Sequence, residues 1–230
     1  MRQFAISDIH GCAKTFQALL EQIKLQPEDE LYLLGDFINR GPDSKGVIDH
    51  IWKLQEAGFQ LFCLRGNHEQ MLLSAIAHPS PYDPPFPEFM RSFGIKKEEE
   101  LPQAYVDWLL ALPYYYEIGK FIFVHAGLSF DGMLPLEDLD PMLWTRDWYA
   151  ELDRKWLGQR MIIHGHTPTH RTEILFQSKA LAELPILCID AGCSHIHRLG
   201  MGHLCAVNLG TKELFFQENI DMGTFSSYAS

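Results

Sequence analysis

The sequence contains no apolar run close to the roughly 18 residues that a membrane-spanning helix needs. Positive charge is also scarce, because 19 Lys and Arg stand against 30 Asp and Glu, for a formal net charge of -11. This balance excludes a broad basic surface, so we expect neither a nucleic-acid scaffold nor a membrane as partner. The first residues, MRQFAIS, are typical of a strand rather than of a secretory leader. We therefore expect a cytoplasmic protein.

Cysteine is represented by five residues, and no two of them have C-x-x-C spacing. An odd count in a 230-residue chain, which is long enough to bury a core without covalent links, favours reduced thiols. The remaining composition, 47% hydrophobic and 21% charged, is that of a folded globular chain. The length favours one domain over residues 1–230.

The first third of the chain repeats a strand, a loop and a helix three times. Apolar strands are predicted at 2–7, 31–34 and 59–64, and helices at 12–25, 42–58 and 70–77. This succession is typical of a parallel, right-handed wound sheet whose strand-to-helix loops meet at one edge. Later strands, which we expect to form a second and mostly antiparallel sheet, are predicted at 114–116, 121–124, 161–163, 186–189, 204–209 and 214–217.

Two sheets that each need cover on the outer face predict an α/β (α+β) fold, a four-layer αββα sandwich of two mixed sheets flanked by helices. Five of the thirteen prolines fall between residues 78 and 87, where regular structure should stop. We expect a surface excursion at about 78–112 and a C-terminal tail from about 219.

Five polar strings each follow a predicted strand. Carboxylate and imidazole groups bind divalent cations, and glycine beside them lets the backbone approach closely. The mixed oxygen and nitrogen donors favour manganese, iron or zinc over calcium, and the lack of thiolates argues against a closed structural zinc site. One such string is typical of an ordinary turn, whereas five together predict a metal site. The strings are Asp8–Gly11, Gly35–Gly41, Arg65–Glu69, His125–Gly127 and His164–Thr167.

These strings resemble the motif series of the calcineurin-like metallophosphoesterases, and within them the phosphoprotein phosphatase family. The resemblance runs from Ser7 to about Gly192. Bacterial members and the related diadenosine tetraphosphatases also carry an LWxR-type string and an HTP sequence, which Leu143–Arg146 and His166–Pro168 match. The resemblance implies an αββα metallophosphoesterase fold and a hydrolase of phosphate esters.

The resemblance also implies two divalent metal ions bridged by one aspartate, with manganese as the first choice and iron or zinc as alternatives. Such ions activate a water for direct attack on phosphorus, so no covalent nucleophile is needed. By motif position, the first ion would be held by Asp8, His10 and Asp36, and the second by Asp36, Asn67, His125 and His166. The phosphate would be bound by Asn67, Arg40, Arg65 and Arg146. For Arg65, a brace beneath the loop is the alternative.

His68 follows the ligand Asn67 directly, and we expect it to act as the general acid that protonates the leaving group. The phosphoprotein phosphatase motif has Asp before Arg-Gly, where this chain has Asn39. We expect the amide oxygen of Asn39 to accept the ring N–H of His68, and to stabilise an imidazolium less than a carboxylate does. Asn39→Asp should therefore favour esters with poor leaving groups.

The substrate remains open between two classes. Diadenosine tetraphosphatases resemble this family yet lack the Asp at the Asn39 position, whereas Glu69 matches the GNHE of the protein phosphatases. On balance the sequence favours a serine/threonine phosphoprotein, with a dinucleoside polyphosphate or another small phosphoester as the alternative. A catalytically silent module that binds a phosphorylated partner is the rival from another class. The oligomeric state is left open.

Several further residues have less specific expectations. His164 should pack or support the ligand His166 rather than bind metal. Asp190 should support a ligand histidine or turn the strand. The stripe Trp144, Trp148 and Trp156 should be core. The basic stretch that follows Cys193 should be a solvated loop or border the cleft; it comprises His195, His197, Arg198 and His203.

Overall fold

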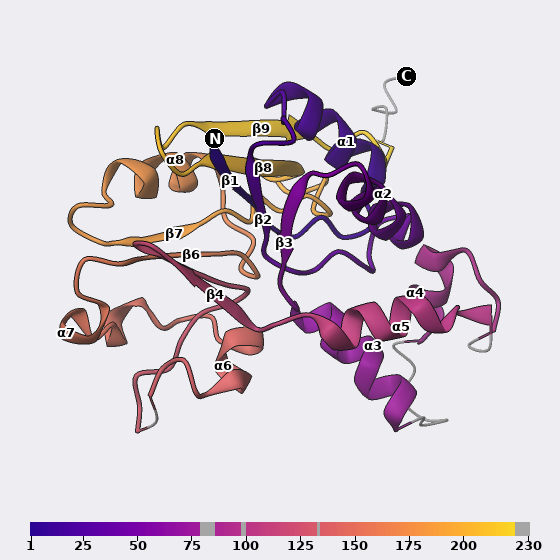
Figure 1. Cartoon of the computed structure of the whole chain (residues 1–230), viewed down its shortest axis with the longest axis horizontal. Coiled ribbons are helices and arrows are strands. Elements are labelled where there is room, and N and C mark those ends of the chain that lie inside the picture. Colours follow the sequence, from indigo (N-terminus) through magenta and orange to yellow (C-terminus); the bar gives the residue numbers. More distant parts are fainter. Residues whose placement is uncertain (79–85, 98–99, 133, 224–230) are drawn as a thin grey trace, which may run out of the picture.

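The computed structural model describes residues 1–78, 86–97, 100–132 and 134–223. Two sheets face each other in this part of the chain, and helices lie on the outer side of each (Figure 1). The predicted four-layer αββα sandwich is therefore confirmed. Among the described residues, no helix combines the length and the apolar character needed to cross a membrane.

The first sheet has five strands in the order β3-β2-β1-β8-β9. Its strands are β1 (Gln3–Ile6), β2 (Glu30–Leu33), β3 (Gln60–Cys63), β8 (His203–Asn208) and β9 (Leu214–Glu218). β1, β2 and β3 pair in parallel, as predicted. Each is followed by a helix on the outer side: α1 (Ala13–Gln22), α2 (Ser44–Glu56) and α3 (Asn67–Ala77).

The second sheet has the order β4-β5-β6-β7. Its strands are β4 (Tyr115–Ile118), β5 (Phe121–Val124), β6 (Met161–His164) and β7 (Ile186–Cys188). The prediction of a mostly antiparallel second sheet is wrong, because β5, β6 and β7 are parallel and the β8-β9 hairpin joins the first sheet instead. Long connections that contain α6 (Leu139–Trp144), α7 (Arg154–Leu157) and α8 (Arg171–Lys179) allow the parallel crossovers.

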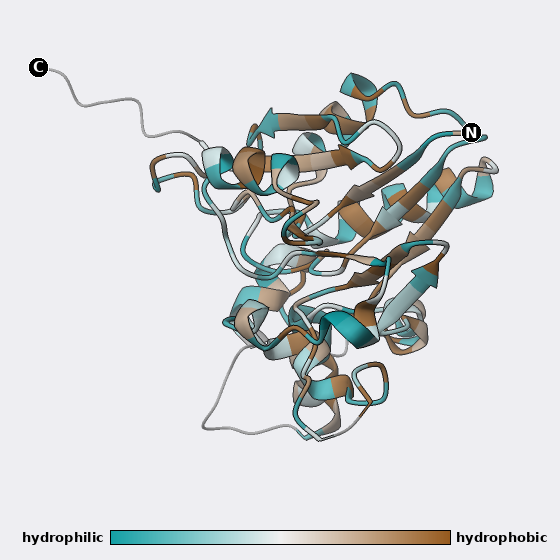
Figure 2. Ribbon diagram, turned by 90° about the vertical axis from the view of Figure 1, so that its left-hand side faces the viewer, coloured by the Kyte–Doolittle hydropathy of each residue, from teal (hydrophilic) through white to brown (hydrophobic). Residues whose placement is uncertain are grey.

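Alternation along each short strand builds three apolar layers. Phe4 and Ile6 face the outer helices of the first sheet, whereas Ala5 between them faces the second sheet. Phe123 likewise enters the layer between the sheets, and Ile122 packs beneath α6 and α7. Figure 2 shows the strands predominantly in hydrophobic colours and the loops between them predominantly in hydrophilic ones.

Two segments outside the sheets complete the frame of the site. The described part of 78–112 forms α4 (Phe86–Phe93) and α5 (Gln103–Ala111), whose buried side chains join the first core layer. Residues 79–85, 98 and 99 of the predicted excursion lie outside the described residues. After β9, the carboxylate of Asp221 accepts the backbone N–H groups of Lys14 and Thr15 at 3.0 and 2.8 Å. It thereby caps the first turn of α1.

Candidate metal centre

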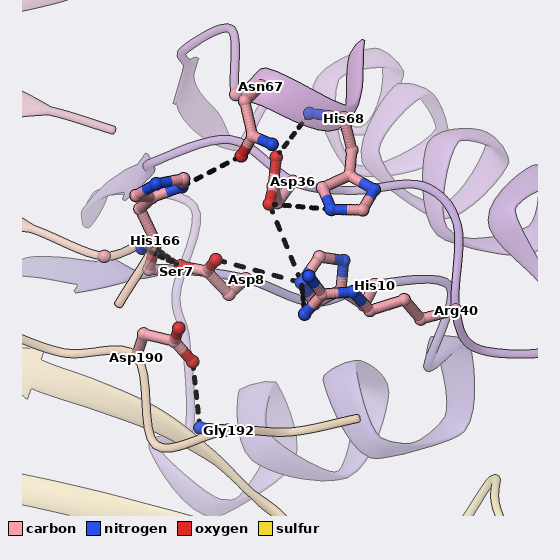
Figure 3. A network of polar contacts seen from close by, with 12 residues as sticks. Ser7, Asp8, His10, Asp36, Arg40, Asn67, His68, His166, Asp190 and Gly192 are labelled. Carbon is pink, nitrogen blue, oxygen red and sulfur yellow. Dashed lines mark hydrogen bonds and ion pairs between the residues drawn. The ribbon is translucent and has the colours of Figure 1, made fainter. Parts of the chain in front are cut away.

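The six predicted ligands come from five loops that follow β1, β2, β3, β5 and β6. All of these loops leave the carboxyl ends of parallel strands, so they meet at one edge of the sandwich. The structure brings all six side chains together and buries every one of them. They are Asp8, His10, Asp36, Asn67, His125 and His166. Five of the six are labelled in Figure 3.

Asp36 lies at the centre of this cluster. Its Oδ2 is 3.6 Å from Nε2 of His10 and 3.9 Å from Nε2 of His68. Its Oδ1 is 3.5 Å from Nε2 of His125 and accepts the backbone N–H of His68. Two overlapping groups of potential ligands share this one carboxylate, namely His10, Asp36 and His68, and Asp36, His125 and His166. Asp36 is thus placed to be shared between two ions, whereas Asp8 belongs to neither group and His68 takes its place in the first.

Asn67 connects the two histidines of the second group. Its Oδ1 lies 3.0 Å from Nε2 of His125 and 2.9 Å from Nδ1 of His166. The other ring nitrogen of His125 donates to the carbonyl oxygen of Leu34 at 2.8 Å. Because a carbonyl only accepts, this bond leaves the Nε2 lone pair of His125 directed at the cluster.

The backbone of these loops is left-handed at the ligands themselves. Eight non-glycine residues of the described chain have positive φ, and six of them lie in the site loops. Such conformations cost of order 1 kcal/mol each and persist only where the surrounding structure imposes them. The six are Asp8, His10, Asp36, Asn39, Arg40 and His166.

Two glycines leave room for the ligand carboxylates. A Cβ on Gly66 would lie 2.2 Å from Oδ1 of Asp36, and one on Gly165 would lie 2.1 Å from Oδ2 of Asp8. Any side chain at either position would therefore displace a carboxylate. The glycines of the Arg65 and His164 strings are required by this close approach.

Glu69 holds two of the ligand loops together, which the sequence analysis did not foresee. Its Oε2 accepts the backbone N–H groups of Asp36 and Gly66, both at 2.8 Å. Its Oε1 accepts those of Phe37 and Ile38 at 2.8 and 3.3 Å. The side chain is fully buried, and burial together with the Asp36 charge raises the pKa of Glu69 to about 7. In the sequence, only its position two residues after the ligand Asn67 points to a role of Glu69 at the site.

The electrostatics of the cluster fit bound divalent cations. Burial and the nearby Asp8 charge raise the pKa of Asp36 well above its ordinary value. Burial and the His125 ring lower the pKa of His166 to about 2, and Nε2 of His166 is buried without a hydrogen-bond partner. Burying unpaired carboxylates and imidazole lone pairs is costly, and cations would offset that cost. The residues present therefore fit a dinuclear centre of mixed oxygen and nitrogen donors.

His68 lies beside the cluster, but its contact with Asn39 differs from the prediction. Oδ1 of Asn39 accepts the backbone N–H of Arg40 at 2.7 Å, and this bond fixes the orientation of the amide. The amide nitrogen, not the oxygen, therefore faces Nδ1 of His68, at 3.2 Å. Asn39 donates to the ring and leaves its hydrogen on Nε2, toward Asp36. Burial and the Arg40 charge lower the pKa of His68 to about 3.

The three predicted arginines separate into two groups. Arg40 and Arg146 are exposed at the cluster: Nη1 of Arg40 donates to Nε2 of His10 at 3.2 Å, and Nη1 of Arg146 donates to the His166 carbonyl at 3.3 Å. Arg65 is buried, and its guanidinium donates to Gln70, Tyr114 and the Leu110 carbonyl. This geometry favours the brace for Arg65, and the predicted phosphate contact is not retained.

The other singled-out residues lie around the centre. His164 accepts the hydroxyl of Tyr149 at 2.5 Å and donates to the Gly165 carbonyl, and it belongs to neither ligand group. Asp190 is buried and accepts the N–H of Gly192. His203 contacts Arg171 at 3.1 Å.

Of the tryptophan stripe, Trp148 and Trp156 join the third apolar layer, whereas Trp144 is 40% exposed. All five cysteines are buried and free.

Comparison with known proteins agrees with this geometry. Residues 1–199 match the model of the calcineurin-like phosphoesterase family. A relative named symmetrical bis(5'-nucleosyl)-tetraphosphatase, from Pseudomonas putida (strain W619), is 32% identical over 133 residues, which cover 56% of this chain and 43% of the relative. The matched region thus spans less than half the length of that relative.

Two solved structures share the fold. A metallophosphoesterase from Sphaerobacter thermophilus aligns with a TM-score of 0.59 and 18% identity, over 94% of this chain and 87% of that chain. A protein serine/threonine phosphatase from Saccharomyces cerevisiae aligns with a TM-score of 0.65 and 14% identity, over 97% and 81%. The chain belongs to the calcineurin-like phosphoesterase family.

Proposed function

We propose that this chain hydrolyses a phosphoric anhydride bond of a dinucleoside polyphosphate, with diadenosine tetraphosphate as the test substrate. The observation that carries the hydrolase proposal is the convergence of the five other buried ligand side chains around Asp36. When bound there, two divalent cations supply Lewis acidity to the phosphoryl oxygens and a deprotonated water for attack. Manganese, iron and zinc all suit the mixed donors. Asp8, His10 and Asp36 would hold one ion, and Asp36, Asn67, His125 and His166 the other.

The reaction forms one bond and breaks one bond. The water oxygen bonds to one of the two central phosphorus atoms, and the bond from this phosphorus to the central bridging oxygen breaks. The electron pair leaves with the departing diphosphate, and the protons of the water pass to solvent. The products are two molecules of ADP. Arg40 and Arg146 stand at the cluster with guanidinium groups suited to the phosphoryl oxygens.

Two findings support the proposal of a dinucleoside polyphosphate over the phosphoprotein that the sequence favoured. The first is the name of the relative, a symmetrical tetraphosphatase. The second is the donor contact from Asn39 to Nδ1 of His68, because a donor does not stabilise a positive charge on the ring. A departing diphosphate needs no strong acid, since its oxygen has a conjugate acid with a pKa of about 6. A serine or threonine alkoxide is a far poorer leaving group and needs one.

The experiment compares diadenosine tetraphosphate with a phosphoserine peptide at matched concentrations and with manganese present. Anion-exchange chromatography of the products should show ADP alone, and kcat/KM should be higher for the dinucleotide. A higher kcat/KM for the peptide would restore the phosphoprotein as substrate. Metal-dependent hydrolysis of p-nitrophenyl phosphate is the accompanying test against a silent binding module, and its absence in metal-loaded protein would support that module.

A further inference from the structure

We infer that a pocket beside Arg40 binds one nucleoside diphosphate half of the substrate, an inference that rests on the proposed function. The pocket has a volume of about 650 Å³, within the range of about 300–1,000 Å³ that is typical of small-molecule sites. Its walls come from the loop 39–42, from α4, from residues 194–197 and from residues 221–223. None of the six metal ligands lines it.

The pocket and the metal centre are joined through one loop. Asn39 and Arg40 line the pocket, and both also contact side chains at the centre, His68 and His10 respectively. Ser44 accepts the backbone N–H of Asn39 at 2.9 Å and donates to the hydroxyl of Ser92 on α4 at 2.7 Å. The α4 wall is thus tied to the loop. Arg40 therefore belongs both to the pocket lining and to the surroundings of the metal centre.

The charges of the lining favour a ligand that carries phosphate. Arg40 and Arg91 both line the pocket, and both side chains are exposed. Of the two acidic residues in the lining, Asp221 directs both carboxylate oxygens at the first turn of α1, which compensates its charge. Glu88, one turn before Arg91, leaves a carboxylate for a hydroxyl or amino group of the ligand. Arg91 is therefore placed to bind a phosphate that is not attacked.

The wall formed by residues 194–197 contains polar atoms that make no hydrogen bond among the described residues, and apolar side chains lie in the same lining. Oγ of Ser194 and Nδ1 of His195 are buried, and neither has a hydrogen-bond partner in the part of the chain that the structure describes. Buried polar atoms are rarely left unpaired, and both belong to residues that line the pocket, so a rotation of these side chains would let them bind hydroxyl or ring-nitrogen groups of a ligand. Ile196 and Met222 lie in the same lining and supply apolar surface for a planar base. A ribose and a base meet both requirements.

The test uses Arg91→Ala, with Arg198→Ala as the matched control. The Arg198 side chain is also exposed and lies in the neighbouring loop, but it does not line the pocket. For each protein, kcat/KM is measured for diadenosine tetraphosphate and for p-nitrophenyl phosphate, which has no second phosphate for Arg91 to bind. Binding of ADP to chelator-treated protein is measured by calorimetry, as a readout independent of catalysis. The kcat/KM values for both substrates and the affinity for ADP are also measured for Ser194→Ala.

Loss of one charged hydrogen bond should lower the ratio of the two kcat/KM values and the ADP affinity roughly tenfold in Arg91→Ala. Arg198→Ala should match the wild type. If the wild type cleaves the dinucleotide but Arg91→Ala keeps both quantities, the pocket inference is overturned and the proposed function stands. If the wild type binds ADP through Arg91 but does not cleave the dinucleotide, the proposed function alone fails.

Discussion

Replacing Glu69 with Gln tests whether one buried carboxylate holds the loops that carry the ligands. Glu69 accepts four backbone N–H groups, two on each oxygen, from the Asp36 loop and from Gly66. An amide has only one oxygen, and its NH₂ group cannot accept a hydrogen bond. Whichever way the amide is turned, two buried N–H groups lose their acceptor and face another donor.

The magnitude follows from that count. Each buried N–H left unpaired costs about 1–3 kcal/mol, so Glu69→Gln should lower the free energy of unfolding by about 3 kcal/mol. For a chain of this size about 1 kcal/mol shifts Tm by roughly 2–4 °C, which gives a decrease of roughly 6–12 °C. The displaced loop carries Asp36, so affinity for manganese should fall as well.

Thermal unfolding in the presence of a chelator measures this effect without any contribution from bound metal. Glu28→Gln makes the same chemical change at an exposed position and serves as the control. A Tm for Glu69→Gln within about 2 °C of both the wild type and the control would refute the reasoning. Two unpaired buried donors should lower the free energy of unfolding by more than such a small shift in Tm implies.

Three further predictions concern separate features. Asn39→Asp places an acceptor beside Nδ1 of His68, and should speed hydrolysis of alkyl phosphates more than of aryl phosphates; equal effects on both would contradict the assigned role of His68. Burial raises the pKa of Asp29, but hydrogen bonds from Arg2 outweigh it and the pKa is lowered. Its stabilising effect is present above the unfolded pKa and is lost as pH falls, so the Tm gap between wild type and Asp29→Asn should narrow below about pH 4; a constant gap would contradict this. Arg65→Met removes the brace and should cost about 2 kcal/mol of stability while KM for p-nitrophenyl phosphate stays near the wild-type value. A large increase in that KM without lost stability would restore the phosphate contact.

The ligand cluster was predictable because loops at the carboxyl ends of parallel strands must meet. Asp8, Asp36 and Asn67 lie in three successive units of this kind, and their convergence follows from the strand order β3-β2-β1. The alternation of core residues followed equally from the strand period. These features depend on local sequence and on general rules of chain connection.

The features that the sequence left open or predicted wrongly depend mostly on partners distant in the chain. The local sequence around β8 does not indicate that this strand pairs with β1 rather than with the second sheet. Arg65 turns inward because Tyr114 and the end of α5 supply acceptors there. Such contacts are decided by tertiary structure. The amide of Asn39 is an exception, because it is oriented by the backbone N–H of its neighbour Arg40, and both residues have a left-handed backbone.

The central claim is that one carboxylate, Asp36, is shared between two metal ions. Calorimetric titration of manganese into chelator-treated protein, with elemental analysis of the purified product, tests it most directly. The wild type should bind two ions per chain, and Asp36→Ala should retain neither at micromolar metal. One ion in the wild type, or two in Asp36→Ala, would contradict the claim.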